Sequence, residues 1–282
     1  MRTYLIPTDF STSSIAAAKY AAYLSKQTGV TRLVLLHAYY VSPFEDMLPS
    51  TEFVQILPQD IEENCRLKTK ELNDLKDQLQ PIVDEGVEIN VHLSRLPLLR
   101  AIYAILERNE IDLLVLCSDN NSGEEYTQVG RNIIKISKLS PVPVLVVPKK
   151  AVAEPLKRVV LACDFKKVTE VIPQHKLKKV WETLDAELLV VNVDTKGLHA
   201  KEDPQMLAEE SALDEMLEDF HPKYYFVENA DAIQGIVDFA TDNHAQLIIA
   251  LPQKYSFFQS YLHNSISKGL TIKSSVPVLL LK

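Results

Sequence analysis

The chain has 282 residues, of which 46% are hydrophobic and 24% are charged, and this composition excludes disordered and fibrous proteins. Its formal net charge of -8 disfavours binding to nucleic acid or anionic lipid, since both rely on clustered lysines and arginines. No apolar stretch approaches the roughly 20 residues of a membrane-spanning helix, and the first residues lack the pattern of a secretory leader. We therefore expect a cytoplasmic protein that contacts neither nucleic acid nor membrane.

The first half of the chain alternates short apolar runs with amphipathic segments. The runs are rich in Val, Ile and Leu without a period of two, which is typical of parallel strands covered by helices on both faces. We expect strands within 4–7, 33–38, 112–117 and 142–147, a further strand that ends at 92–94, and helices over 12–26, 61–83 and 98–108. Ser11 to Ser14 offer N-caps for the first helix, and Gly29 offers its C-terminal stop.

The second half repeats the first. Residues 159–165 match 4–10, since each is an apolar run that ends in Asp-Phe, and residues 276–281 match 142–147 around a shared Val-Pro-Val-Leu. Between the matching runs we expect helices over 168–184, 206–220, 232–243 and 262–272. A period of roughly 150 residues indicates two tandem domains rather than a solenoid.

These patterns predict an α/β fold made of two doubly wound open sheets, each with five parallel strands. We place the first domain at residues 1–150 and the second at residues 151–282, with the boundary in the short run 149–155. The linker is short, so we expect the domains to pack together through their fifth strands.

Ligands of open α/β sheets bind beyond the carboxyl ends of the strands, where the strand order reverses. With the first strand central, that point lies at Pro7-Thr8-Asp9 and Cys117 in the first domain, and at Cys163-Asp164 and Leu251-Pro252 in the second. Asp9 suits a ribose or an adenine amino group, and it suits equally well a structural role at the start of the following helix.

The organisation resembles the universal stress protein family in its tandem form. The resemblance rests on Pro7-Thr8-Asp9-Phe10-Ser11, on Leu35-Leu36-His37-Ala38 and on Val142 to Pro148, and it extends over nearly the whole chain. It implies an adenine-nucleotide-binding-like fold with the strand order 3-2-1-4-5 and fifth strands that pair. It also implies a loop after strand four, G-x-x-G-x9-G-[S/T], whose backbone amides hold the phosphates of ATP.

Both halves depart from that loop. The first half has Cys117, Asn120, Gly130 and Arg131 at the four signature positions, and the second half has Leu251, Lys254, Asn264 and Ser265. One glycine of three survives in the first half and none in the second, although bare backbone at a phosphate normally calls for glycine. Arg131 could bind a phosphate, close the site by reaching Asp9, or point into solvent.

The candidate nucleotide-binding residues follow from these positions. The first domain offers Pro7, Thr8, Asp9, Ala38, Cys117, Asn120, Gly130, Arg131 and Asn132. The second offers a weaker set: Asp164, Lys254, His263, Asn264 and Ser265.

The remaining motifs favour a binding protein over an enzyme. The seven histidines lack metal-ligand spacing, and we interpret His37 as a core residue and the three cysteines as reduced core thiols. No nucleophile elbow, Walker A loop or G-x-G-x-x-G is present. We expect a non-catalytic, ligand-sensing stress-response protein with no certain cofactor, for which ATP or another adenine nucleotide is the candidate. Its partners would be an unidentified protein or a second copy of the chain.

Two alternatives stay open. The first is slow ATP hydrolysis in the first domain. The second is a pocket lined anew for another small molecule.

Overall fold

In the computed structural model the strands form one continuous sheet. The structure describes residues 2–40, 58–108, 110–118, 133, 135–137, 139–164, 168–181, 184–195, 204–251 and 266–281. Ten strands run in the order β3-β2-β1-β4-β5-β10-β9-β6-β7-β8. Each half therefore has the order 3-2-1-4-5, as expected.

The strands have the following bounds. In the first half they are β1 (Arg2–Pro7), β2 (Val30–Ala38), β3 (Glu88–Ser94), β4 (Leu113–Ser118) and β5 (Val144–Pro148). In the second half they are β6 (Arg158–Ala162), β7 (Glu187–Asp194), β8 (Lys223–Glu228), β9 (Leu247–Ala250) and β10 (Val278–Leu280).

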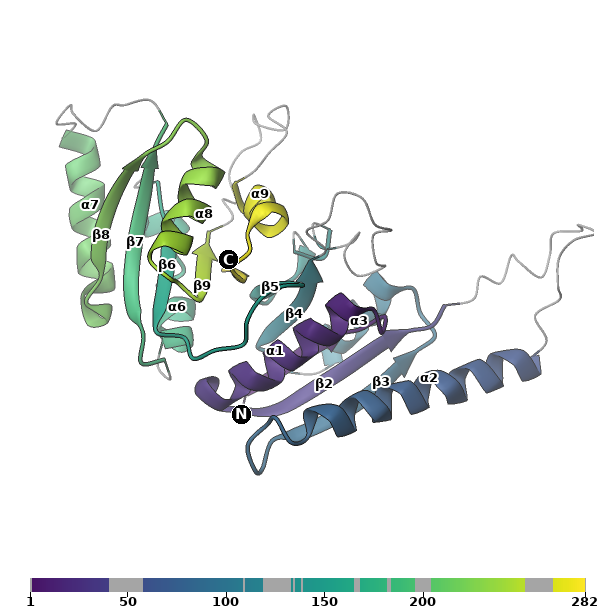
Figure 1. Ribbon diagram of the computed structural model, residues 1–282. Helices are drawn as coiled ribbons and strands as arrows, with labels where there is room; N and C mark the ends of the chain where they lie inside the picture. The colour runs from purple at the N-terminus through teal and green to yellow at the C-terminus, as the bar shows by residue number, and fades with distance from the viewer. Residues whose placement is uncertain are drawn as a thin grey trace, which may run out of the picture.

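The helices cover both faces of the strands. The first half has α1 (Thr12–Thr28), α2 (Pro58–Leu79) and α3 (Leu98–Arg108). The second half has α5 (Val168–Val171), α6 (Gln174–Trp181), α7 (Pro204–Leu217), the short 3-10 turn η2 (Glu218–Phe220), α8 (Ala232–Asp242) and α9 (Ile266–Lys273). In Figure 1, α1 and α2 lie in front of the first-half strands and α3 lies behind them, while α8 and α9 pack together in the second half.

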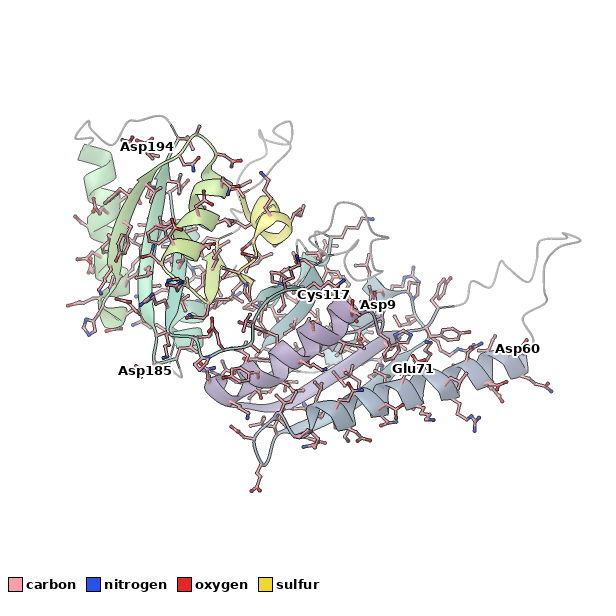
Figure 2. The ribbon with its side chains drawn as sticks, in the orientation of Figure 1. Asp9, Asp60, Glu71, Cys117, Asp185 and Asp194 are labelled. Carbon is pink, nitrogen blue, oxygen red and sulfur yellow. The ribbon has the colours of Figure 1, made fainter. Side chains whose placement is uncertain are left out.

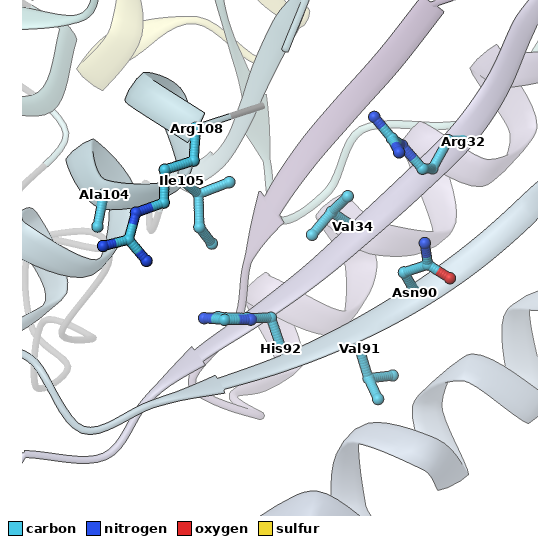
Figure 3. Close-up of a pocket in the computed structure, with 8 residues that line it drawn as sticks. All are labelled: Arg32, Val34, Asn90, Val91, His92, Ala104, Ile105 and Arg108. Atoms are coloured by element: carbon cyan, nitrogen blue, oxygen red, sulfur yellow. The ribbon is translucent and has the colours of Figure 1, made fainter. Parts of the chain in front are cut away.

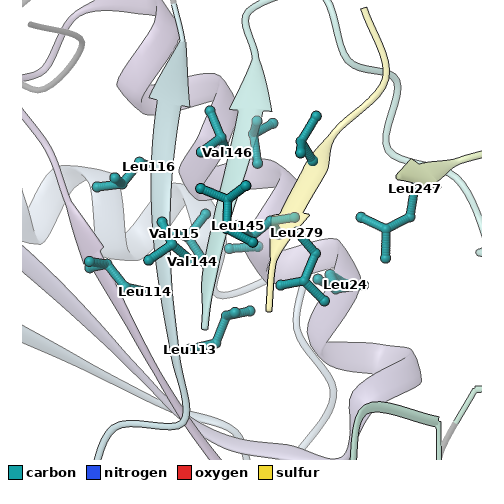
Figure 4. Packing of buried hydrophobic residues seen from close by; sticks show 14 of the residues in the cluster. Leu24, Leu113, Leu114, Val115, Leu116, Val144, Leu145, Val146, Leu247 and Leu279 are labelled. Atoms are coloured by element: carbon teal, nitrogen blue, oxygen red, sulfur yellow. The ribbon is translucent and has the colours of Figure 1, made fainter. Parts of the chain in front are cut away.

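The two halves join through β5 and β10, which pair antiparallel, whereas every other pair in the sheet is parallel. Leu145 lies opposite Leu279 in this register, and both side chains are almost fully buried. All residues of β4 and β5 are buried, so this junction lies in the middle of the hydrophobic core (Figure 4). The predicted pairing of the fifth strands is confirmed. A domain boundary at 150/151 stays a prediction, because the sheet and its core continue across it.

Equivalent hydrogen bonds in the two halves support the internal repeat. The Ser140 hydroxyl donates to the Val142 carbonyl at 2.8 Å, and the Ser274 hydroxyl donates to the Val276 carbonyl at 2.7 Å. Each serine oxygen also accepts from the backbone N–H of the same valine. The same turn therefore leads into β5 and into β10.

The single helix expected over 168–184 is wrong. The structure has two short helices there, α5 and α6, separated at Ile172-Pro173. Proline has no N–H to donate within a helix, and its ring disfavours helical geometry in the preceding residue. Pro173 therefore separates α5 from α6. Helix α6 starts directly after it, and the Pro173 carbonyl accepts from the N–H of Leu177 at 3.0 Å.

Two other helices differ from expectation at their ends. The helix expected over 61–83 spans Pro58–Leu79, and the helix expected over 206–220 ends at Leu217 and continues as the 3-10 turn. Both helices also begin earlier than expected, at Pro58 and at Pro204, while at their C-terminal ends hydrogen bonding often changes to the tighter pattern.

Candidate functional site

The strand order reverses between β1 and β4, and again between β6 and β9, so each half has one switch point at the carboxyl ends of these strands. We call residues 7–9 together with 117–118 the first strand-end site, and residues 162–164 together with 250–251 the second. The β1–β4 register pairs Leu5 with Leu114, so Thr8 comes level with Cys117. Figure 2 shows Asp9 and Cys117 near each other at this edge of the sheet.

Thr8 and its neighbours form a tight hydrogen-bonded turn. The Thr8 N–H donates to the Leu36 carbonyl at 2.7 Å, and its Oγ1 accepts from the Phe10 N–H at 3.1 Å. The same Oγ1 lies 3.1 Å from the Ser14 hydroxyl, within α1. Phe10 has a φ of 61°, a left-handed conformation that is uncommon for a residue with a side chain. Strand β1 is thus tied to the start of α1 through a turn held in one shape.

Asp9 lies at the surface of this turn and is half-buried. Its Oδ1 accepts from the Ser11 N–H at 3.2 Å, which is an Asx-turn contact. The N-cap of α1 is Ser11, whose Oγ accepts from the Ser14 N–H at 3.2 Å. Asp9 therefore shapes the turn without capping the helix, so its structural role is that of an Asx turn, while the N-cap is Ser11, one of the serines expected for it.

His37 is a satisfied core histidine, as expected. Its side chain is 7% exposed, its Nδ1–H donates to the Thr8 carbonyl at 2.8 Å, and its ring lies 4.6 Å from that of Phe10. Burial lowers the pKa of His37, and the positive charge of Lys68 lowers it further, while the bond to Thr8 opposes the shift. The buried, neutral imidazole thus holds the strand-end turn in position through its hydrogen bond to the Thr8 carbonyl.

Lys68, on α2, was missed by sequence reasoning. Its ammonium lies 5.1 Å from the centre of the Phe10 ring and 2.8 Å from the Glu71 carboxylate. Only the packing of α2 against β2 and β3 brings this lysine to Phe10, next to the first strand-end site. The result is a cation beside an aromatic ring near Asp9.

The other first-half candidates on β1, β2 and β4 belong to the core. Pro7 and Ala38 are buried, and Cys117 is 1% exposed, in β4 between β1 and β5. The Ser118 carbonyl accepts from the Lys149 N–H at 3.1 Å. These residues form the base of the site. Asn120, Gly130, Arg131 and Asn132 lie outside the described residues, so their proposed roles stay predictions.

The second strand-end site repeats this arrangement with different side chains. Asn192 occupies the place of His37: it is 6% exposed, and its Nδ2 donates to the Cys163 carbonyl at 3.0 Å. The Cys163 N–H donates to the Val191 carbonyl at 3.0 Å, as Thr8 does to Leu36. Asp164 is exposed. Lys254, His263, Asn264 and Ser265 lie outside the described residues.

The described residues hold no group of three or more potential metal ligands. Cys65, Cys117 and Cys163 form no disulfide with one another. Cys117 is buried in the core and the half-buried Cys163 packs against it, but Cys65 is half-buried on α2 outside the core, so the expectation of a core thiol is wrong for Cys65. Among the helices that the structure describes, none combines the length and the apolar character that crossing a membrane requires.

The doubly wound sheet places the chain in the class of open α/β folds. Ligands of this class bind at the switch point, which is where the two strand-end sites lie. Residues 1–148, more than half of the chain, match the model of the universal stress protein family, and the chain belongs to that family. A comparison with curated proteins finds no match.

Solved structures share the fold over the full length. A universal stress protein from Archaeoglobus fulgidus DSM 4304 superposes with a TM-score of 0.66 and 17% identity, covering 99% of this chain and 96% of that one. A protein of unknown function from Pseudomonas aeruginosa PAO1 gives 0.64 and 15%, covering 100% and 92%. At these identities the likeness concerns the fold alone.

Proposed function

We propose that the chain is a non-catalytic, ligand-sensing member of its family, and that its first strand-end site holds the nucleoside end of an adenine nucleotide. The observation that carries this proposal is the way in which hydrogen bonds hold the polar side chains of that site. Thr8 and His37 are tied to each other and to α1, and the half-buried Asp9 is held in the same turn, where its Oδ1 accepts from the Ser11 N–H. A carboxylate fixed in this way can accept hydrogen bonds from ribose hydroxyls or an adenine amino group.

The case against catalysis comes from the sequence of the loops after β4 and β9. Phosphate transfer needs a cradle of backbone amides and a positioned base, and the two loops keep one of the six signature glycines. The buried His37 is 7% exposed and donates its Nδ1–H to the Thr8 carbonyl, so it serves the turn. We infer that a nucleoside triphosphate binds with nearly the same free energy as the corresponding monophosphate.

The two strand-end sites differ in a way that favours the first. Asp9 is half-buried, and Lys68 lies 5.1 Å from the ring centre of the adjacent Phe10, whereas Asp164 is exposed. A partly buried carboxylate forms stronger hydrogen bonds to a ligand than an exposed one, because water competes less. We therefore assign nucleotide binding to the first half.

The proposal extends to location and partners. The free thiols fit a reducing cytoplasm. Because β10 already occupies the edge of β5, a homodimer would have to use another surface.

Thermal unfolding with adenosine, AMP and magnesium-ATP, together with a phosphate-release assay, tests the proposal. We expect all three ligands to stabilise the protein by similar amounts, up to about 2.7 kcal/mol at a hundredfold excess over the dissociation constant, and no phosphate release. Asp9→Ala should abolish the stabilisation, while the matched variant Asp164→Ala keeps it.

Three results would contradict the proposal. Phosphate release that disappears in Asp9→Ala would show an ATPase. Stabilisation that Asp164→Ala removes would place the site in the second half. No stabilisation by any adenine compound would favour a site lined for another small molecule.

A further inference from the structure

A second candidate site lies away from the strand ends, on the face of the sheet that α3 covers. A cavity of about 210 Å³ opens there between β2, β3 and α3. It is lined by Arg32, Val34, Asn90, Val91, His92, Ala104, Ile105 and Arg108. Figure 3 shows that these side chains come from three elements, with Arg108 and Arg32 at opposite sides of the cavity in this view.

The lining combines an apolar floor with polar groups at its rim. Ile105 is 5% exposed, and Val34 and Ala104 are half-buried beside it. The Arg32 Nε donates to the Thr3 hydroxyl at 3.3 Å, which holds this half-buried side chain in the cavity lining. Arg108 is exposed at the end of α3.

The residues that line the cavity carry positive charge, whereas the chain as a whole is acidic. Arg32 and Arg108 are in the lining and no Asp or Glu is, although Glu107 adjoins Arg108 in the sequence and the formal net charge of the chain is -8. Glu88 lies opposite Arg32 in the β2–β3 register, but neither Arg32 nor Arg108 forms an ion pair within the part of the chain that the structure describes. Two arginines without a carboxylate partner beside a cavity favour an external anion, because guanidinium groups match the geometry of carboxylate and phosphate.

We propose that this cavity binds a small organic oxyanion, with its phosphate or carboxylate group on Arg108 at the rim and its apolar part on Val34 and Ile105, while Arg32 adds positive charge from the opposite side. The volume sets the size of the ligand, since sites for drug-sized molecules enclose about 300–1,000 Å³ and this cavity is smaller. Asn90 and His92 supply further hydrogen-bonding groups on β3. The ligand class is a phosphate monoester or a carboxylate with a compact apolar body.

This site is separate from the first strand-end site. Arg32 lies near the amino end of β2, whereas the strand-end site lies at the carboxyl ends of β1 and β4. The proposal therefore does not depend on nucleotide binding at Asp9.

Two-dimensional NMR titration of the full chain tests the proposal with three compounds of similar size: phenyl phosphate, benzoate and the neutral benzyl alcohol. We expect phenyl phosphate and benzoate to shift the amide signals of Asn90, His92 and Ala104 in a saturable manner, and benzyl alcohol to bind at least about tenfold more weakly. Tighter binding of phenyl phosphate assigns the site to phosphate monoesters, and tighter binding of benzoate assigns it to carboxylates.

Two charge-matched variants locate the anion. Arg108→Gln should raise the dissociation constant about tenfold, because a charge-assisted hydrogen bond is lost. Arg100→Gln removes the same charge two turns earlier on α3, outside the lining, and should change it less than about twofold. Since Arg108 is exposed, its replacement leaves the fold intact.

The proposal is overturned if benzyl alcohol binds as tightly as the anions, or if Arg100→Gln weakens binding as much as Arg108→Gln does. It is also overturned if the shifted signals belong to Thr8 and Asp9 instead of the cavity.

Discussion

Replacing His37 by asparagine should preserve the strand-end turn, because the second half of the chain already uses that residue. Asn192 Nδ2 donates to the Cys163 carbonyl at 3.0 Å, in the position where His37 Nδ1 donates to the Thr8 carbonyl at 2.8 Å. The variant His37→Asn loses the ring contact with Phe10, whose centre lies 4.6 Å away, and we expect a cost of about 1 kcal/mol. His37→Leu keeps apolar contact but leaves the buried Thr8 carbonyl without this donor, at an added cost of about 1–3 kcal/mol.

The same variants test the pH dependence. Burial lowers the pKa of His37 in the folded state, so between that value and the ordinary 6.5 the unfolded chain binds more protons than the folded one. Wild-type stability should therefore fall as the pH drops below about 6.5. Both His37→Asn and His37→Leu should lose this part of the acid sensitivity, because neither side chain titrates.

Urea unfolding at neutral and mildly acidic pH measures both effects. The control is His175→Asn, at an exposed position on α6, which should stay within about 0.5 kcal/mol of wild type. The reasoning is refuted if His37→Leu is more stable than His37→Asn, or if His37→Asn retains the full acid sensitivity of wild type.

Further variants test the junction and the repeat. Leu279→Ala should destabilise the protein by about 2–5 kcal/mol in urea unfolding, because its side chain is buried opposite Leu145, whereas the 62% exposed Leu139 should tolerate alanine within about 0.5 kcal/mol. Equal losses for both variants would mean that the β5–β10 junction is not packed as described. Ser140→Ala and Ser274→Ala should each cost about 1–2 kcal/mol, since each removes the same two hydrogen bonds before a fifth strand; a loss in only one half would contradict the equivalence of the two turns.

The fold could be predicted from the sequence because its strands carry unbroken apolar runs. Residues 142–147 and 276–281 repeat one motif, and the structure places both at the centre of the sheet. The helix break at Pro173 could have been predicted as well, since proline is a strong local signal. The helical periodicity on both sides of it concealed the break.

The chemical environment of the sites was less predictable, because it depends on contacts between distant elements. Lys68 reaches Phe10 only through the packing of α2. Arg32, His92 and Arg108 come from three elements, and no local pattern links them. The sequence did place Thr8 and Asp9 at the strand end and the N-cap within Ser11 to Ser14, since a strand followed by capping residues is a local signal, but it could not tell that Asp9 would form an Asx turn.

A crystal structure of the protein grown with magnesium-ATP tests the central claim most directly. The account predicts adenosine beside Asp9 in the first half, with the phosphates extending toward solvent and the second half empty. A triphosphate enclosed by backbone amides of the segment after β4, or of the segment after β9, would contradict it.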